Sequence, residues 1–243
     1  MTVGSRHRLV VSAGLKKSGS GLMFNLLNEL VSRSVGVDAR RIRDEYALDR
    51  HLRQENVLLG SLRVHRIAPL ARPVLQGERF VVKTHAPPRL TFRLLATAGV
   101  VRPVLSIRDP RAIAASALSH GARDRTRGVP GVMASVVTVD DAVLFAEQQV
   151  SVARRWMGVA GLVVVRYEDL VQDLVQTATD LSSALGLPLD AVGVARAAQA
   201  SEASPGDLHR SEGRPHAVDD LPASARRRLA SGASALGYAT LQT

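Results

Sequence analysis

Cysteine is absent from the 243-residue sequence, and this absence excludes disulfide bonds and thiolate metal sites. Aromatic residues are also scarce at 3%, so Val, Leu and Ala must build the core, and few rings are present to stack on nucleic-acid bases. The apolar run at residues 9–15 is too short for a signal peptide or a membrane span. These absences lead us to expect a cytoplasmic protein.

The remaining composition is that of a globular domain with a strong positive charge. Since 46% of the 243 residues are apolar, we expect residues 1–243 to form one α/β domain. Lys and Arg total 32 against 22 Asp and Glu, and the net charge of +10 favours an anionic partner such as a nucleotide, a nucleic acid or a membrane surface. The surplus is mostly arginine in a chain rich in Ala and Val, so we attribute part of it to a GC-rich genome and expect a bacterial origin.

A glycine-rich loop follows the first apolar run. Gly14 and Gly19 have the spacing of the phosphate loop G-x-x-x-x-G-K-[ST], but the next residues are Ser20 and Gly21, and the lysines stand upstream. The run at 9–13 predicts a buried strand, and apolar spacing near 3.6 from Ser20 onward predicts a helix. Strand, loop and helix N-terminus together form an anion cradle. The missing Lys-[ST] pair argues against a metal-bridged triphosphate, so we expect no metal.

Apolar strands alternate with helices along the rest of the chain. This alternation predicts an α/β fold of three layers, with a mostly parallel sheet flanked by helices. We expect a polar loop or lid at 121–135, and 37–77 shows no clear pattern. Further strands are expected at 79–85, 102–108 and 162–167, and helices at 90–98, 110–120, 139–157, 175–185, 189–200 and 221–236.

Four segments, each at a predicted strand end, resemble the motifs of sulfotransferases that use 3′-phosphoadenosine 5′-phosphosulfate (PAPS). In chain order, GLKKSGSG (14–21) resembles P-K-S-G-T-T, KTHAP (83–87) resembles K-T-H-x-P, RDPRAIAAS (108–116) resembles R-N-P-K-D-x-x-x-S, and RYEDL (166–170) resembles R-Y-E-D-L. The resemblance implies a fold related to P-loop NTPases and PAPS as donor co-substrate.

The resemblance also implies residues that hold the donor. Arg108 and Ser116 would bind the 3′-phosphate, Tyr167 would pack near the adenosine, and Lys17 would contact the oxygen that bridges phosphate and sulfate. The family often has Thr and Trp where Gly21 and Leu22 stand, so a hydroxyl and a possible base-stacking ring are missing. The 5′-side of the donor would be lined by Lys16, Lys17, Ser18, Gly19, Ser20, Gly21 and Leu22.

Catalysis is expected at the second motif. His85 would take the proton of an acceptor hydroxyl, and Lys83 would hold the sulfuryl oxygens beside Lys17. A closing R-K-G motif has only a poor counterpart at 209–214, where Arg210, Gly213 and Arg214 are the candidates.

Plainer interpretations stay open for each of these residues. The lysines could be solvated, Arg108 could form a surface ion pair, and His85 could cap a strand end. A nucleotide-dependent kinase on the same scaffold and a basic nucleic-acid-binding protein are the alternative functions.

The acceptor cannot be identified from the motifs. We expect a hydroxyl of a small molecule, a natural product or a carbohydrate, with neither nucleic acid nor membrane as partner, and a homodimer is left open. Arginines in the polar segments could favour an anionic or phosphorylated acceptor.

Overall fold

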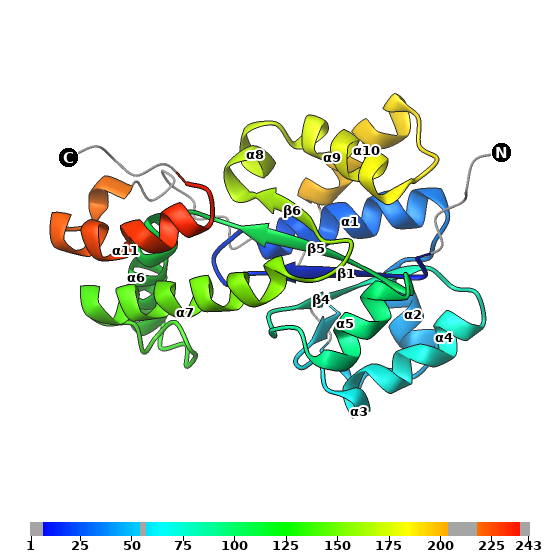
Figure 1. Cartoon of the computed structure of the whole chain (residues 1–243), viewed down its shortest axis with the longest axis horizontal. Coiled ribbons are helices and arrows are strands. Elements are labelled where there is room, and N and C mark those ends of the chain that lie inside the picture. The colour runs from blue at the N-terminus through cyan, green and yellow to red at the C-terminus, as the bar shows by residue number, and fades with distance from the viewer. Residues whose placement is uncertain (1–6, 54–56, 204–217, 239–243) are drawn as a thin grey trace.

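A six-stranded sheet organises the computed structural model, which describes residues 7–53, 57–203 and 218–238. The strand order is β2-β3-β4-β1-β5-β6 (Figure 1). All neighbours are parallel except β2 and β3, which pair antiparallel. The prediction of a mostly parallel sheet is confirmed. The strands are β1 (Leu9–Gly14), β2 (Leu52–Arg53), β3 (Leu58–Leu59), β4 (Phe80–Thr84), β5 (Val101–Ile107) and β6 (Val163–Arg166).

Helices cover both faces of the sheet, which gives the predicted three layers. In Figure 1, α1, α8, α9 and α10 lie on one face, and α2, α4 and α5 lie on the other. Helices α6, α7 and α11 pack together, and α7 runs from this group back along the sheet, where it contacts β5. The helices are α1 (Ser20–Ser34), α2 (Ala39–Glu45), α3 (Val64–Ile67), η2 (Ala68–Leu70), α4 (Ala71–Leu75), α5 (Leu90–Thr97), α6 (Pro110–Thr126), α7 (Val139–Met157), α8 (Tyr167–Gln172), α9 (Leu174–Leu185), α10 (Ala191–Ala203), η3 (Val218–Asp220) and α11 (Ala223–Ala235).

The core is dominated by aliphatic side chains, as the composition predicted. Every residue of β1 and of β4 is buried, because both strands lie inside the sheet between two helical layers. The few aromatic side chains fill the largest buried volumes. Phe92 of α5 meets Trp156 of α7 edge to face, with 5.2 Å between ring centroids.

The polar segment at 121–135 differs from the predicted loop. Helix α6 continues to Thr126, so the expected end at residue 120 was wrong. Gly121 lies inside the helix where a Cβ would come within 2.5 Å of the carbonyl oxygens of Met133 and Val136. Arg125 donates to the carbonyl of Val136 at 2.7 Å. The glycine therefore serves close packing, and the arginine fastens the following loop to α6.

The segment at 37–77, where no pattern was evident, contains short elements held by local caps. Asp38 begins α2 by accepting hydrogen bonds from the backbone N–H groups of Arg40 at 2.7 Å and Arg41 at 3.4 Å. Asn28 of α1 donates to the other Asp38 oxygen at 2.6 Å. Strands of two residues and helices of four to seven are too short for periodicity to show.

Candidate functional site: an anion cradle at the carboxyl edge of the sheet

The predicted site residues come together because their strands are parallel neighbours. Gly14 at the end of β1 is in register with Ser106 of β5, and Ala13 with Thr84 of β4. Ile107 of β5 is in register with Arg166 of β6. The glycine-rich loop, His85, Arg108 and Tyr167 therefore follow adjacent strands at one edge, where open α/β sheets bind ligands.

The loop after β1 has a strained backbone. Lys17 and Gly19 both have left-handed conformations, with φ of 70° and 69°. Left-handed backbone is ordinary for glycine but uncommon for lysine, and such outliers often occur at ligand sites. Within the loop, the Lys16 N–H donates to Gln149 and the Ser18 N–H donates to Leu15, so the N–H groups of Lys17 and Gly19 are the ones that could serve an anion.

Ser18 holds this loop in place from inside. Its hydroxyl is fully buried, 2.7 Å from the carbonyl of Leu15 and 2.9 Å from the Ser106 hydroxyl of β5. Its backbone N–H also donates to the carbonyl of Leu15 at 3.2 Å. The sequence had suggested that Ser18 lines the phosphate. The structure directs its polar groups into the protein instead, so Ser18 shapes the cradle without facing it.

Helix α1 begins directly after the loop and leaves donors at its N-terminus. Gly19 is its N-cap and supplies no side-chain cap. The first backbone N–H groups, from Ser20 onward, therefore lack the usual capping oxygen, and the helix dipole adds to their attraction for an anion. Ser20 is buried, whereas Gly21 and Leu22 are half-buried. Gly14 permits this close start, since a Cβ there would lie 2.5 Å from Ser20 Cβ.

Lys17 is linked to a helix one hundred residues away. Its Nζ lies 2.9 Å from Nδ1 of His120 on α6. The Nε2 of His120 lies 3.4 Å from Oδ1 of Asp124. Burial, with the positive charges of Arg123 and Arg108, lowers the pKa of the Lys17 ammonium from 10.5 to about 8. An anion in the cradle would raise that pKa again.

His120 is the functional candidate that sequence reasoning missed. Ser116, His120 and Asp124 are spaced by four residues and share one face of α6. That i, i+4 spacing was available in the sequence. The predicted end of the helix at residue 120 concealed it.

Arg108 is a buried cation at the centre of the site. It is 6% exposed, and its guanidinium donates to the Lys17 carbonyl at 3.1 Å and lies 4.1 Å from the Tyr167 ring centroid. Burial lowers the pKa of Arg108, against the opposing influence of Tyr167 and Glu168. Its buried Nε has no hydrogen-bond partner, and no carboxylate of the described residues forms an ion pair with it. A surface ion pair is therefore not the role of Arg108. Among the described residues no carboxylate contacts the guanidinium directly, and an anionic ligand could make that contact.

Tyr167 of α8 lies against this guanidinium, and Ser116 lies on α6, the helix that begins directly after Arg108 and Asp109. Ser116 is buried on α6, and its hydroxyl makes no hydrogen bond to the part of the chain that the structure describes. Tyr167 opens α8, an element that the sequence did not predict. Glu168 accepts from the Asp109 N–H at 3.3 Å and from the Tyr238 hydroxyl at 2.8 Å. Burial, followed by the Glu168 charge, raises the pKa of Tyr238, so its hydroxyl stays protonated and donates.

His85 and Lys83 lie at the end of β4. Nδ1 of His85 is 2.7 Å from the carbonyl oxygen of Gly14 and must donate to it. In the neutral ring this bond places the unshared electron pair on Nε2, the tautomer that a general base requires. Lys83 is 4% exposed and in register with Ser12, so it is not the solvated strand residue of the plainer interpretation.

Comparisons with known proteins are informative only at the level of structure. No protein-family model matches the chain, and no curated protein matches it in sequence. A retinol dehydratase, crystallised with androsterone and the inactive cofactor PAP, superimposes with a TM-score of 0.53 at 18% identity, over 100% of this chain and 84% of the other. A sulfotransferase domain from the curacin biosynthetic pathway gives 0.54 at 14% identity, over 96% and 98%. A mouse sulfotransferase complexed with PAP gives 0.53 at 12% identity, over 96% and 89%.

This chain has the sulfotransferase fold. The fold agrees with the sequence motifs that resemble those of sulfotransferases, because the four motifs lie at the ends of β1, β4, β5 and β6 in that order. In this sulfotransferase fold, the hydrogen bond from Arg108 to the Lys17 carbonyl joins the segment after β5 to the loop after β1.

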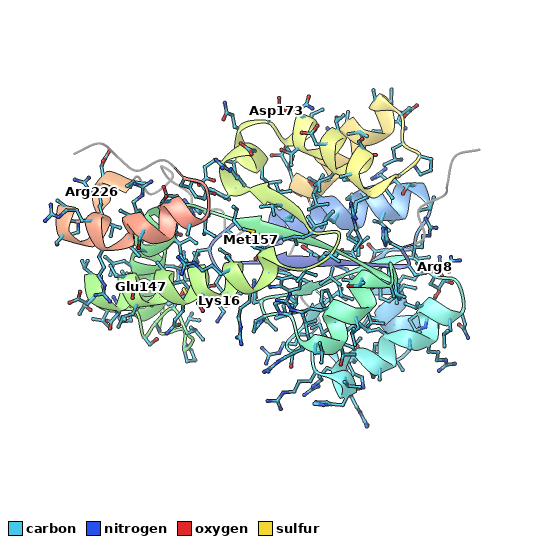
Figure 2. The ribbon with its side chains drawn as sticks, viewed as in Figure 1. Arg8, Lys16, Glu147, Met157, Asp173 and Arg226 are labelled. Carbon is cyan, nitrogen blue, oxygen red and sulfur yellow. The ribbon has the colours of Figure 1, made fainter. Side chains whose placement is uncertain are left out.

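A cavity of about 660 Å³ opens beside this cradle in the sulfotransferase fold. His85, Ala86 and Pro87 form one side, and Arg53 with residues from Leu58 to Arg66 forms another. Lys16 belongs to both the loop and the cavity. Its backbone N–H donates to Gln149 of α7 at 3.0 Å, and Figure 2 shows it beside that helix.

Some expected features fall outside the description. Arg210, Gly213 and Arg214 lie in 204–217, beyond the described residues. Within the described ranges, no three His, Asp or Glu side chains gather closely enough to hold a metal ion. None of the helices described there has the length and apolar character needed to cross a bilayer.

We expect Gly19→Ala to destabilise the protein more than Gly128→Ala. Both glycines have positive φ, which costs a side chain about 1–2 kcal/mol. A Cβ at Gly19 would also lie 2.6 Å from Tyr167 Cδ2, whereas one at Gly128 meets nothing within 4 Å. Urea unfolding of the two variants measures the difference. Equal losses of unfolding free energy would contradict the close approach of Tyr167 to the loop.

Proposed function

We propose that the protein, as a single domain of residues 1–243, is a sulfotransferase that moves a sulfuryl group from PAPS to a hydroxyl of a small-molecule acceptor. The observation that carries this proposal is Arg108, a buried cation without a carboxylate partner among the described residues, bonded to the loop that bears Lys17. One ligand with anionic groups at both ends would satisfy both residues. The known structures that contain PAP on this fold support the choice of donor.

The chain's own residues fit such a donor. Loop N–H groups and the start of α1 would hold the 5′-side, and Arg108 with the Ser116 hydroxyl would hold the 3′-phosphate. The donor supplies an activated sulfuryl group when it is bound. A nucleotide-dependent kinase would instead need the lysine after Gly19 that accompanies Mg²⁺-bound phosphates, and Ser20 stands there.

Lys17 would stabilise charge during transfer. Negative charge grows on the leaving phosphate oxygen as the S–O bond breaks, and a fixed ammonium lowers the energy of that state more than of the ground state. His120 accepts from the Lys17 ammonium, and Asp124 lies next to His120, so these two residues position the charge.

His85 would act as general base. The Gly14 carbonyl fixes its ring by the Nδ1–H bond, and Nε2 would accept the proton of the acceptor hydroxyl as that oxygen forms its bond to sulfur. The oxygen gains the sulfuryl group, the phosphate oxygen keeps the bonding electron pair, and the proton remains on His85 until solvent takes it. Lys83 would lie near the sulfuryl oxygens from β4.

We expect Arg108→Met to weaken binding of adenosine 3′,5′-bisphosphate without loss of stability. The change removes a buried charge, which is often neutral or stabilising, and it removes the charge-assisted bonds to phosphate, so affinity falls at least about tenfold. Thermal shift with the bisphosphate, and separately with ATP and Mg²⁺, tests both statements. Stabilisation of the unaltered protein by ATP–Mg²⁺ alone would favour the kinase and contradict the proposal.

His85→Asn is expected to lose turnover by about 10²–10⁴-fold while keeping donor binding. The Asn amide can still donate to the Gly14 carbonyl, so the β4 end keeps its shape, but no base replaces Nε2. Activity is followed by the mass gain of about 80 Da on a panel of alcohols, phenols and glycans, using the value for one SO₃ group. Near-normal turnover in this variant would refute the role of His85. For Lys17→Ala we expect loss of both turnover and donor binding.

Binding of adenosine 3′,5′-bisphosphate at pH 9 should take up a proton. The free Lys17, with a pKa of about 8, is mostly neutral there, and the bound anion raises that pKa. Below about 8 the amine is protonated in both states, so the uptake disappears as pH falls. Calorimetry in two buffers of different ionisation enthalpy measures it, and Lys17→Arg, which is always charged, is the control. Equal uptake in the Arg variant would assign the proton to another group.

The lowered pKa of Lys17 also makes the stability of the ligand-free protein depend on pH. The folded state loses its Lys17 proton near pH 8, whereas the unfolded chain keeps it to about 10.5. The unfolded chain therefore binds more protons between these values, and the contribution of Lys17 to stability rises with pH across that window.

A further inference from the structure

The described lining of the cavity beside His85 carries charge of one sign. Two of these lining residues are histidines, His65 and His85, and among the described residues of the lining none is Asp or Glu. Leu58, Leu62 and Pro87 add apolar surface. The Lys and Arg side chains in the lining are Lys16, Arg53, Arg63, Arg66 and Arg89.

These cations differ from several other surface arginines of the molecule. Arg33, Arg41 and Arg228 each lie within 3.0 Å of a carboxylate oxygen. Within the described ranges, none of the five cavity cations forms such an ion pair, and the Arg66 guanidinium donates to the neutral carbonyl of Arg50 at 3.2 Å. The cavity therefore concentrates positive potential that the described protein does not neutralise.

The position of this charge relates it to the reaction. His85 is in the cavity wall, and Lys16 is adjacent in sequence to Lys17 of the donor loop. A molecule in the cavity would present its hydroxyl to His85 while another part of it faces the arginines around α3.

We propose that the cavity is an acceptor site for hydroxyl compounds that carry a phosphate or carboxylate group, with Arg63 and Arg66 as the residues that select for it. Only the expectation that the hydroxyl of the bound compound is sulfated rests on the proposed function. Recognition of the anionic group stands on the cavity alone. Guanidinium groups suit both anions because their paired N–H donors match two oxygens.

A small acceptor fits these observations better than a polyanion. The volume of about 660 Å³ is within the range of small-molecule sites, and the described lining contains no aromatic ring other than histidine on which nucleic-acid bases could stack.

Binding of matched ligands tests the site independently of turnover. Glucose, glucose 6-phosphate and glucuronate are titrated into protein saturated with adenosine 3′,5′-bisphosphate, so that the cradle is filled. We expect the two anions to bind and glucose to bind at least about tenfold more weakly, as for loss of a charge-assisted contact. The preference should decline with salt.

Two variants provide the comparison. Arg63→Gln/Arg66→Gln should remove the preference for the anions, and Arg154→Gln, an exposed α7 arginine outside the cavity, should keep it. Circular dichroism confirms that both are folded. Equal binding of glucose and its phosphate, or a preference unchanged in the double variant, would overturn the inference. Stronger binding of a single-stranded oligonucleotide, lost in the double variant, would also overturn it in favour of a nucleic acid.

Turnover separates this inference from the function on which it partly rests. Sulfation of glucose and glucose 6-phosphate at equal kcat/KM would refute the acceptor class and leave the sulfotransferase intact. Selective anion binding without bisphosphate binding or any sulfation would refute the sulfotransferase and leave the anion site.

Discussion

The hydrogen bond between the Arg108 guanidinium and the Lys17 carbonyl is the interaction on which the candidate site depends. It joins the loop after β1 to the segment after β5, at neighbouring strand ends of a parallel sheet. The bond sets the orientation of the Lys17 peptide, whose residue has a left-handed backbone. With Ser18 anchored to β5 beneath it, the loop is held from two directions, so its N–H groups are oriented before any ligand arrives.

The same arrangement explains why this loop differs from a nucleotide phosphate loop. In a nucleotide phosphate loop, the lysine stands directly after the last glycine and reaches the β- and γ-phosphates. Here the ammonium precedes Gly19 and lies against α6 through His120. Ser20 and Gly21 stand where a nucleotide phosphate loop has its lysine and its Mg²⁺-binding hydroxyl. The loop therefore departs from the pattern of a metal-bridged triphosphate site.

Much of the fold could be predicted from the sequence, because buried parallel strands are continuous apolar runs and their ends are marked by glycine or by charge. The strands β1, β4, β5 and β6 and the order of the motifs follow from that rule. The direction of a small side chain does not, and Ser18 was assigned to the ligand although its hydroxyl faces Ser106. The contact between Lys17 and His120 joins residues that are distant in sequence, and a glycine at 121 was mistaken for a helix end when its function is close packing. The short elements between 37 and 77, some of which contribute Arg53, Arg63 and Arg66 to the cavity wall, lack the length that periodicity requires.

The burial of two cations destabilises the ligand-free site and also favours anionic ligands. Burial lowers the pKa of both Lys17 and Arg108, which means that the folded protein holds these two cations less favourably than water does. The aliphatic core must offset that unfavourable term in the ligand-free state. An anion that bridged the two groups would remove this unfavourable term, and that gain would form part of its binding free energy. A neutral ligand of the same shape would not gain it, so we expect the cradle to discriminate by charge more than by shape.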